Sequence, residues 1–174
     1  MHASYNRLIL GGARSGKSRH AQALALSLSD APIYLATSRR WDDDHADRIA
    51  KHKADRGPAW TTIEAEKAID LASVEGRVVV VDCLTLWLTN LFFDASYDHD
   101  ATLTAATRIL DAALTKRCTW LFVSNEVGMG VHAETAIGRK FCDLQGWANQ
   151  YVAVRVPSVT LMVAGIPLPV KSPP

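Results

Sequence analysis

The sequence has little cysteine, no long hydrophobic run and no excess of charge of either sign. Its three cysteines, Cys83, Cys118 and Cys142, are odd in number and widely spaced. This pattern excludes a disulfide framework and a zinc-binding spacing, and it suits a reducing compartment. No apolar run reaches the roughly 18 residues of a membrane-spanning helix, and residues 1–10 lack the apolar core of a signal peptide. We therefore expect a cytoplasmic protein without stable membrane insertion.

The charge balance bears on possible partners. Lys and Arg number 19 and Asp and Glu number 18, which leaves a net charge of +1 with neutral histidines. This balance excludes a strong whole-molecule attraction to nucleic acid, although it permits a local positive patch. Hydrophobic residues make up 48% of the chain, a globular composition that argues against disorder. We expect one domain spanning residues 1–174 and no nucleic-acid partner.

Five short apolar runs divide the chain into alternating segments. They are Arg7–Leu10, Ile33–Ala36, Val78–Val81, Trp120–Val123 and Val159–Val163. Continuous rather than alternating hydrophobicity predicts burial on both faces, as in a parallel sheet that is covered by helices. The sequence therefore predicts an α/β fold with a mostly parallel sheet.

The segments between and after these runs differ in character. Apolar spacing predicts helices that contain Leu103–Leu114 and Phe141–Tyr151. Asp42–Lys53 has acids first and bases last, which suits a helix dipole, but Ile49 is its only large apolar residue. We expect this segment to be a helix that projects from the body. The tail Pro167–Pro174 contains four prolines and is expected to be irregular or to lie at a sheet edge.

The strongest motif is a phosphate loop directly after the first apolar run. It reads G-x-x-x-x-G-K-[ST], and a predicted helix, Arg19–Ser29, follows it. Backbone amides of such a loop cradle phosphate oxygens, Lys17 reaches the β- and γ-phosphates, and the Ser18 hydroxyl ligates Mg²⁺. The predicted phosphate-binding residues are Gly11, Gly12, Ala13, Arg14, Ser15, Gly16, Lys17 and Ser18.

Polar residues follow two further apolar runs. Asp82 directly follows the run Val78–Val81. A nucleotide-bound Mg²⁺ needs a carboxylate at such a strand end beside a phosphate loop. Ser18 and Asp82 are therefore the predicted Mg²⁺ residues. Ser124–Gly130 follows the fourth run. On the residues alone, this segment fits a functional loop and a plain strand–helix connection equally well.

Four segments in this order carry a family resemblance: Gly11–Ser18, Ala36–Ser38, Arg48–Lys53 (RIAKHK) and Asn125–Gly130 (NEVGMG). Together they resemble the bifunctional adenosylcobinamide kinase / adenosylcobinamide-phosphate guanylyltransferase of cobalamin biosynthesis. The resemblance implies a RecA-like P-loop fold and a homotrimer. It also implies phosphorylation of adenosylcobinamide with ATP or GTP, followed by transfer of GMP from GTP to adenosylcobinamide phosphate.

The resemblance also implies residue roles. His52 matches the histidine that forms a GMP–histidine intermediate, and Lys17 is the second catalytic residue. The implied nucleotide contacts are the loop Gly11–Ser18 with Ala36, Thr37, Ser38, Lys53, Ala54, Asp55, Arg56, Glu64 and Asp82. The sequence departs from the family pattern at Lys51, where some relatives have a second histidine, at Asp82, which replaces Glu, and in the prolines of the last strand.

Two other functions fit the phosphate loop. The first is a P-loop small-molecule kinase in which His52 has no role. The second is a nucleotide-dependent switch or assembly ATPase without a small-molecule acceptor. The second is weakened because the chain has no clustered basic face and no added interaction region.

Overall fold

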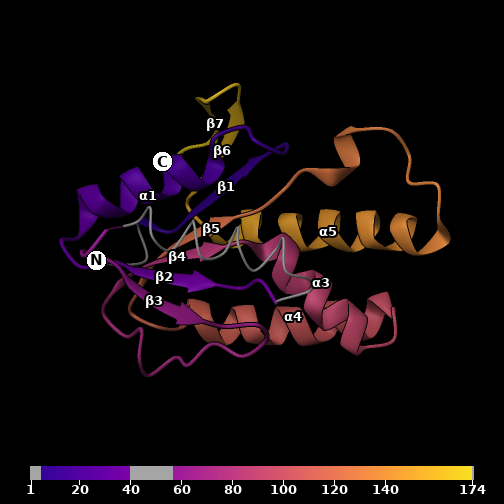
Figure 1. Cartoon of the computed structure of the whole chain (residues 1–174), viewed down its shortest axis with the longest axis horizontal. Helices are drawn as coiled ribbons and strands as arrows, with labels where there is room; N and C mark the ends of the chain where they lie inside the picture. The colour runs from indigo at the N-terminus through magenta and orange to yellow at the C-terminus, as the bar shows by residue number, and fades with distance from the viewer. Residues whose placement is uncertain (1–4, 40–56, 174) are drawn as a thin grey trace.

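A computed structural model describes residues 5–39 and 57–173 of the chain (Figure 1). Within these residues, seven strands form one sheet in the order β3-β2-β4-β5-β1-β6-β7. The strands are β1 (Arg7–Gly11), β2 (Ile33–Ala36), β3 (Thr61–Glu64), β4 (Val78–Asp82), β5 (Thr119–Val123), β6 (Ser158–Val163) and β7 (Ile166–Lys171). The helices are α1 (Lys17–Leu28), α3 (Leu84–Asp94), α4 (His99–Leu114), α5 (Ala136–Arg155) and the short 3₁₀ helix η2 (Val127–Met129).

All neighbouring strands are parallel except β6 and β7. The continuous apolar runs are explained by burial on both faces of this sheet. In β4, Val79 and Val81 belong to one hydrophobic cluster, whereas Val78 and Val80 belong to another. The predicted α/β fold with a mostly parallel sheet is therefore confirmed.

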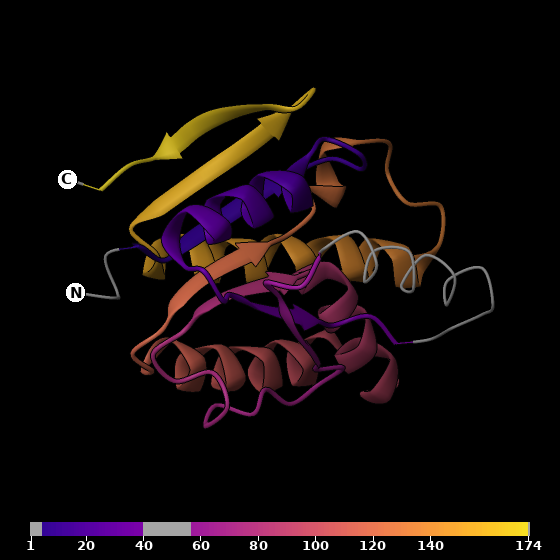
Figure 2. The same ribbon diagram turned by 60° about the vertical axis from the view of Figure 1, so that its left-hand side comes forward.

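The helices form a layer on each face of the sheet (Figures 1 and 2). Helix α1 covers one face with Ala21 and Ala25, which are fully buried. Helices α3, α4 and α5 cover the other face, where the fully buried rings of Trp120 and Phe122 of β5 stack 5.8 Å apart. The larger core lies on this second face. None of the helices in the described ranges is both long and apolar enough to cross a membrane.

Two elements carry weak sequence signals. Strand β3 has four residues and no buried side chain, so it lacks the continuous apolar pattern of the other parallel strands. Helix α3 buries Leu84, Trp87, Leu88 and Phe92, and it contacts both α4 and α5. A helix enclosed on several sides is apolar around much of its circumference, so the amphipathic period that identifies surface helices is weak.

The structure corrects one predicted boundary and decides between two alternatives for the tail. The helix after the phosphate loop spans Lys17–Leu28 rather than Arg19–Ser29, because Gly16 is its N-cap and Ser29 is extended. The tail is not irregular, since Ile166–Lys171 forms antiparallel strand β7. It does lie at the sheet edge, as expected, and an edge strand tolerates prolines because no further strand needs their missing N–H groups. The predicted helix at residues 42–53 lies outside the described residues.

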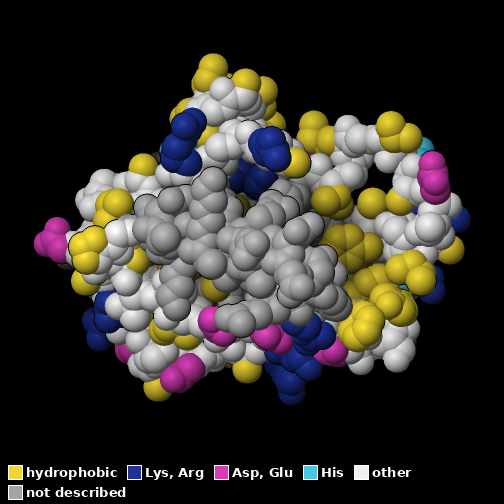
Figure 3. Space-filling view, in the orientation of Figure 1, with side chains coloured by type: hydrophobic (Ala, Val, Ile, Leu, Met, Phe, Trp, Pro, Cys, Tyr) yellow, Lys and Arg dark blue, Asp and Glu magenta, His cyan; other side chains and the backbone are white. Residues whose placement is uncertain are grey.

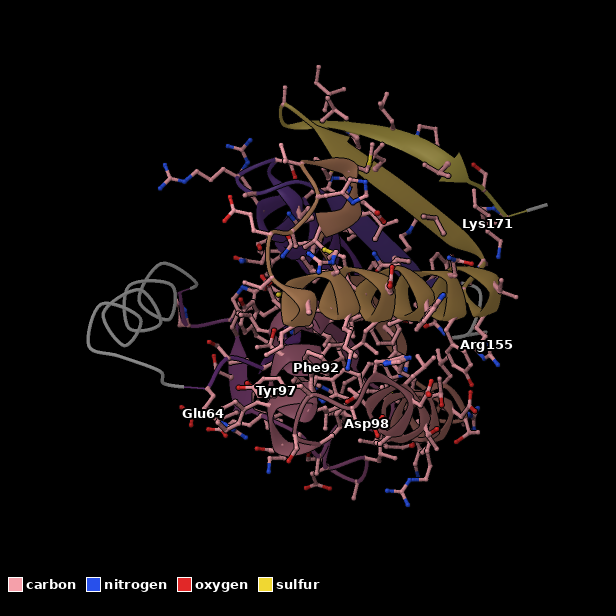
Figure 4. All side chains as sticks on the ribbon, turned by 90° about the vertical axis from the view of Figure 1, so that its right-hand side faces the viewer. Glu64, Phe92, Tyr97, Asp98, Arg155 and Lys171 are labelled. Carbon is pink, nitrogen blue, oxygen red and sulfur yellow. The ribbon has the colours of Figure 1, made fainter. Side chains whose placement is uncertain are left out.

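Lys171 joins the edge strand to the end of α5. Its Nζ donates hydrogen bonds to the carbonyl oxygens of Ala153, Val154 and Val156 at 2.8, 3.3 and 2.6 Å. A cation at a helix C-terminus also interacts favourably with the helix dipole. Figure 4 shows Lys171 at the end of the antiparallel pair, close to the C-terminal part of α5.

We expect Lys171→Met to lower the free energy of unfolding by about 1–2 kcal/mol, because three carbonyl groups lose a charged donor. Thermal and denaturant unfolding measure this change. Lys116→Met is the matched control, since the one ion pair that Lys116 makes among the described residues is a partly exposed one with Glu75 at 3.8 Å. Such a pair contributes under about 1 kcal/mol. Equal destabilisation by both substitutions would contradict the role of Lys171.

Candidate nucleotide-binding site

The phosphate loop connects β1 to α1 and is shaped by its glycines. A Cβ atom at Gly11 would lie 2.6 Å from the carbonyl oxygen of Met162, so no larger residue fits there without movement. Gly16 has φ of +94°, a left-handed conformation that suits glycine. The loop is also tied to the β6–β7 turn, because the Gly165 amide donates to the Ser15 carbonyl oxygen at 3.0 Å. The loop geometry therefore depends on strands that are far away in the sequence.

The loop surrounds a concavity of about 330 Å³. Its lining is Arg14, Ser15, Gly16, Lys17, Ser18 and Arg19. The open N-terminal turn of α1 faces this space, and a helix N-terminus with glycine-rich backbone favours phosphate groups. The Ser15 hydroxyl is buried and has no hydrogen-bond partner among the described residues.

Lys17 is the buried cation of the loop. Its side chain lies in the first turn of α1, and Nζ donates to the carbonyl oxygen of Gly12 at 2.6 Å. Burial lowers the pKa of Lys17 from its usual value, and the negative charge of the nearby Asp82 opposes this shift. A buried ammonium group is costly unless it is paired with an anion. Lys17 makes no ion pair with the residues that the structure describes, and a phosphate group has the charge that suits this position.

Asp82 ends β4, near the phosphate loop. Its Oδ2 accepts a hydrogen bond from the Tyr34 hydroxyl at 3.0 Å. The next residue, Cys83, is buried, and burial raises the pKa of its thiol to about 11. This thiol is therefore protonated at neutral pH and is a poor nucleophile.

The segment Ala36–Ser38 continues from β2 beside Asp82. Thr37 donates through Oγ1 to the Cys83 carbonyl oxygen at 2.8 Å, and the buried Asn90 of α3 donates to the Thr37 carbonyl oxygen at 2.8 Å. Asn90 also donates to the Glu66 carbonyl oxygen at 2.9 Å. Sequence reasoning missed Asn90, although a polar residue within an apolar helix is a signal for such a role.

Exposed salt bridges hold Arg39, the residue that follows Ala36–Ser38. Arg39 donates to Glu66 at 3.0 Å and to Asp94 at 3.1 and 3.2 Å. Lys67 also pairs with Asp94. Hydrogen bonds from Arg39 and Lys67 lower the pKa of Asp94 to about 2, so this carboxylate stays charged across the ordinary pH range.

Strand register brings the predicted residues to one edge of the sheet. Ala36 pairs with Glu64 in β3 and with Asp82 in β4, and Asp82 pairs with Val123 in β5. Because the strands are parallel, their carboxyl ends lie at the same edge as the phosphate loop. Figure 4 labels Glu64 at the end of β3. His52 and Lys53, Ala54, Asp55 and Arg56 lie outside the described residues, so their positions relative to this edge stay predictions.

Basic side chains are not gathered into one face in the view of Figure 3. Lys and Arg side chains form separate small groups, with acidic and apolar side chains between them. Among the described residues, no group of three or more His, Cys, Asp or Glu side chains could hold a metal ion.

Comparison with known proteins identifies the family. Residues 7–170 match the family model described as cobinamide kinase / cobinamide phosphate guanyltransferase. The chain belongs to this family. The bifunctional adenosylcobalamin biosynthesis protein CobP of Pseudomonas aeruginosa is 42% identical over 96% of this chain and 98% of its own length. The bifunctional adenosylcobalamin biosynthesis protein CobU of Escherichia coli K12 is 38% identical over 94% of this chain and 98% of its own length.

Membership of this bifunctional family confirms that the chain is an enzyme of the kinase and guanylyltransferase class. The fold is shared more widely. An ATPase from a bacterial type III secretion system aligns with a TM-score of 0.54 and 8% identity, over 91% of this chain and 51% of that protein. This likeness concerns the fold alone, and it agrees with the expected P-loop NTPase architecture.

Proposed function

We propose that this chain phosphorylates adenosylcobinamide with ATP or GTP and then converts adenosylcobinamide phosphate to adenosylcobinamide-GDP with GTP. The observation that carries the proposal is the phosphate loop with its buried Lys17, at the same sheet edge as Asp82, in a member of this bifunctional family. The nucleotide would lie along Gly11–Ser18, Ala36–Ser38, Lys53–Arg56, Glu64 and Asp82, and one triphosphate site would serve both reactions.

His52 is the nucleophile of the second reaction in this proposal. A ring nitrogen of His52 forms a bond to the α-phosphorus of GTP while the bond from that phosphorus to the bridging oxygen breaks, and pyrophosphate leaves. A phosphate oxygen of the acceptor then attacks the α-phosphorus and releases the imidazole. Neutral imidazole is abundant near pH 7 because its ordinary pKa is about 6.5. Lys17 stabilises negative charge on the departing pyrophosphate.

Mg²⁺ is the cofactor that this chemistry calls for, and the residues fit it. Nucleotide-bound Mg²⁺ takes most of its oxygen ligands from phosphates and water and needs few from protein. The Ser18 hydroxyl and the Asp82 carboxylate would hold it, and Tyr34 orients that carboxylate. When bound, Mg²⁺ neutralises charge on the phosphate oxygens.

A labelling experiment tests the two activities separately. With GTP labelled at the α-phosphate, the protein should form an acid-labile, alkali-stable adduct in the absence of acceptor. With GTP labelled at the γ-phosphate, the label should pass to adenosylcobinamide. Transfer of the γ-label without an adduct would instead indicate a kinase only, and nucleotide binding without either transfer would indicate a switch or assembly ATPase.

The domain organisation, oligomeric state and compartment of the protein are proposed as well. We propose a single domain, residues 1–174, that assembles as a homotrimer in the cytoplasm. Exposed apolar residues on the β6–β7 pair support an assembly contact, namely Val163, Ile166, Leu168 and Val170. Sedimentation equilibrium should give three times the chain mass of 19.0 kDa. A concentration-independent monomer mass would contradict the trimer.

A further inference from the structure

Three buried polar side chains form a network behind the loop that follows β5. Asn149 and Gln145 of α5 contact Ser124 at the end of β5. The Ser124 hydroxyl donates to Asn149 Oδ1 at 2.7 Å, and Gln145 Nε2 contacts Ser124 Oγ at 2.9 Å and Asn149 Oδ1 at 3.0 Å. All three residues are at most 5% exposed. Burying polar groups is costly, so such a network is expected to hold a neighbouring group in a fixed position.

The network ends on the carboxylate of Glu126. Asn149 Nδ2 donates to Glu126 Oε1 at 3.0 Å and to the Asn125 carbonyl oxygen at 3.1 Å. Because Asn149 Oδ1 already accepts two hydrogen bonds, the amide group cannot turn around without losing them. Asn149 therefore presents a fixed donor to Glu126. No partner of Glu126 Oε2 occurs among the residues that the structure describes, and the side chain is partly exposed.

The backbone of Glu126 is joined to the phosphate loop. Its amide donates to the carbonyl oxygen of Gly11 at 3.2 Å, and the Asn125 amide donates to Thr85 Oγ1 at 3.0 Å. Strand β5 lies between β1 and β4, so Glu126 follows the strand that separates the phosphate loop from Asp82. A carboxylate with one oxygen bound by Asn149, and the other without a partner in the described part of the chain, thus lies at the edge where the γ-phosphate is expected.

We propose that Glu126 is the general base of the kinase reaction and that Asn149 is its positioning residue. This inference rests on the proposed function. The hydroxyl oxygen of the acceptor forms a bond to the γ-phosphorus, the bond from that phosphorus to the β–γ bridging oxygen breaks, and the nucleoside diphosphate leaves. The hydroxyl proton passes to Glu126 and then to water. Asp82 is less suited, because its Oδ2 already accepts from Tyr34 and its charge is needed beside the phosphates.

The two chemistries of the enzyme differ in their need for this base. Only the kinase reaction has a hydroxyl proton to remove. Neutral imidazole attacks GTP through a lone pair, and the acceptor of GMP is a phosphate that is already an anion. A base that acts on the acceptor hydroxyl should therefore affect γ-phosphoryl transfer and leave formation of the GMP adduct unchanged.

The test is Glu126→Gln, which keeps the size of the side chain and an oxygen that can accept from Asn149. We expect kcat for γ-phosphoryl transfer to adenosylcobinamide to fall by about 10²-fold or more, within the range for loss of a general base. The rate of adduct formation from α-labelled GTP should stay within about three-fold. Glu134→Gln is the matched control, because Glu134 is an exposed carboxylate of the same connection to α5.

Two results would overturn the inference. One is a Glu126→Gln enzyme whose γ-phosphoryl transfer is as fast as that of the Glu134→Gln enzyme. The other is an equal loss of both half-reactions, which would indicate a disturbed nucleotide site. A wild-type enzyme that forms the adduct but never phosphorylates adenosylcobinamide would refute the kinase part of the proposed function itself. Glu126→Asp, which keeps a carboxylate, should recover part of the kinase rate.

Asn149→Ala tests the positioning role. We expect it to lower kcat of the kinase reaction without changing KM for GTP or the rate of adduct formation. In the double variant with Glu126→Gln, the kinase rate should be within about two-fold of that of Glu126→Gln alone, because residues that act as a unit are not additive. Additive losses in the double variant would overturn the coupling between Asn149 and Glu126.

Discussion

Replacing His52 with alanine is expected to abolish the GMP adduct and to lower formation of adenosylcobinamide-GDP by at least about 10³-fold, the scale of losing a covalent nucleophile. Phosphorylation of adenosylcobinamide should continue within about three-fold, because the γ-phosphate is transferred directly to the acceptor. Gel autoradiography with α-labelled GTP measures the adduct, and chromatography of the corrinoid products measures both transfers.

The matched control for this prediction is His45→Ala. His45 is seven positions before His52 and is the other histidine of the same predicted helix. It should leave the adduct at the wild-type level. If the protein still carries the α-label in the His52 variant, or loses it in the His45 variant, the assignment of the nucleophile is wrong. Loss of kinase activity in the His52 variant would mean that the histidine also contributes to the first reaction.

The features of the fold that the sequence predicted are those with a local cause. The central strands were predictable because burial on both faces requires continuous apolar runs, as in Val78–Val81. Strand β3 was not, because two of its four residues are exposed and none is buried, and they gain their strand geometry from pairing with β2. The prolines of β7 suggested either irregular structure or a sheet edge, and β7 is an edge strand, which has a side on which missing N–H groups cost nothing.

The residues of the site likewise fall into those with a local sequence signal and those without one. The phosphate loop is a contiguous motif, so Gly11–Ser18 could be read directly from the sequence. The partners that orient the other groups depend on register and helix packing. Tyr34 and Asp82 are 48 positions apart and meet because β2 and β4 pair. Asn149 and Glu126 are 23 positions apart and meet because α5 packs behind β5. No periodicity in a single sequence contains these relations.

Lys17→Ala is expected to lower both activities together, each by about 10²–10³-fold, the cost of removing one preorganised charge from a transition state. The reason is that a single triphosphate site would place the same ammonium group on the γ-phosphate in one reaction and on the departing pyrophosphate in the other. Parallel assays with γ- and α-labelled GTP measure the two losses. Lys140→Ala, an exposed lysine of α5, is the control.

The stability of the Lys17 variant separates a functional role from a structural one. The pKa of Lys17 is lowered by burial, so the charged side chain is held at a cost in the free protein. Its hydrogen bond to Gly12 is its only one among the described residues. Replacing the Lys17 side chain with that of alanine should therefore leave the melting temperature unchanged or higher while both activities fall. Guanylylation that stays at the wild-type rate in Lys17→Ala would instead require a second nucleotide site. The prediction that one phosphate loop serves both reactions would then be wrong.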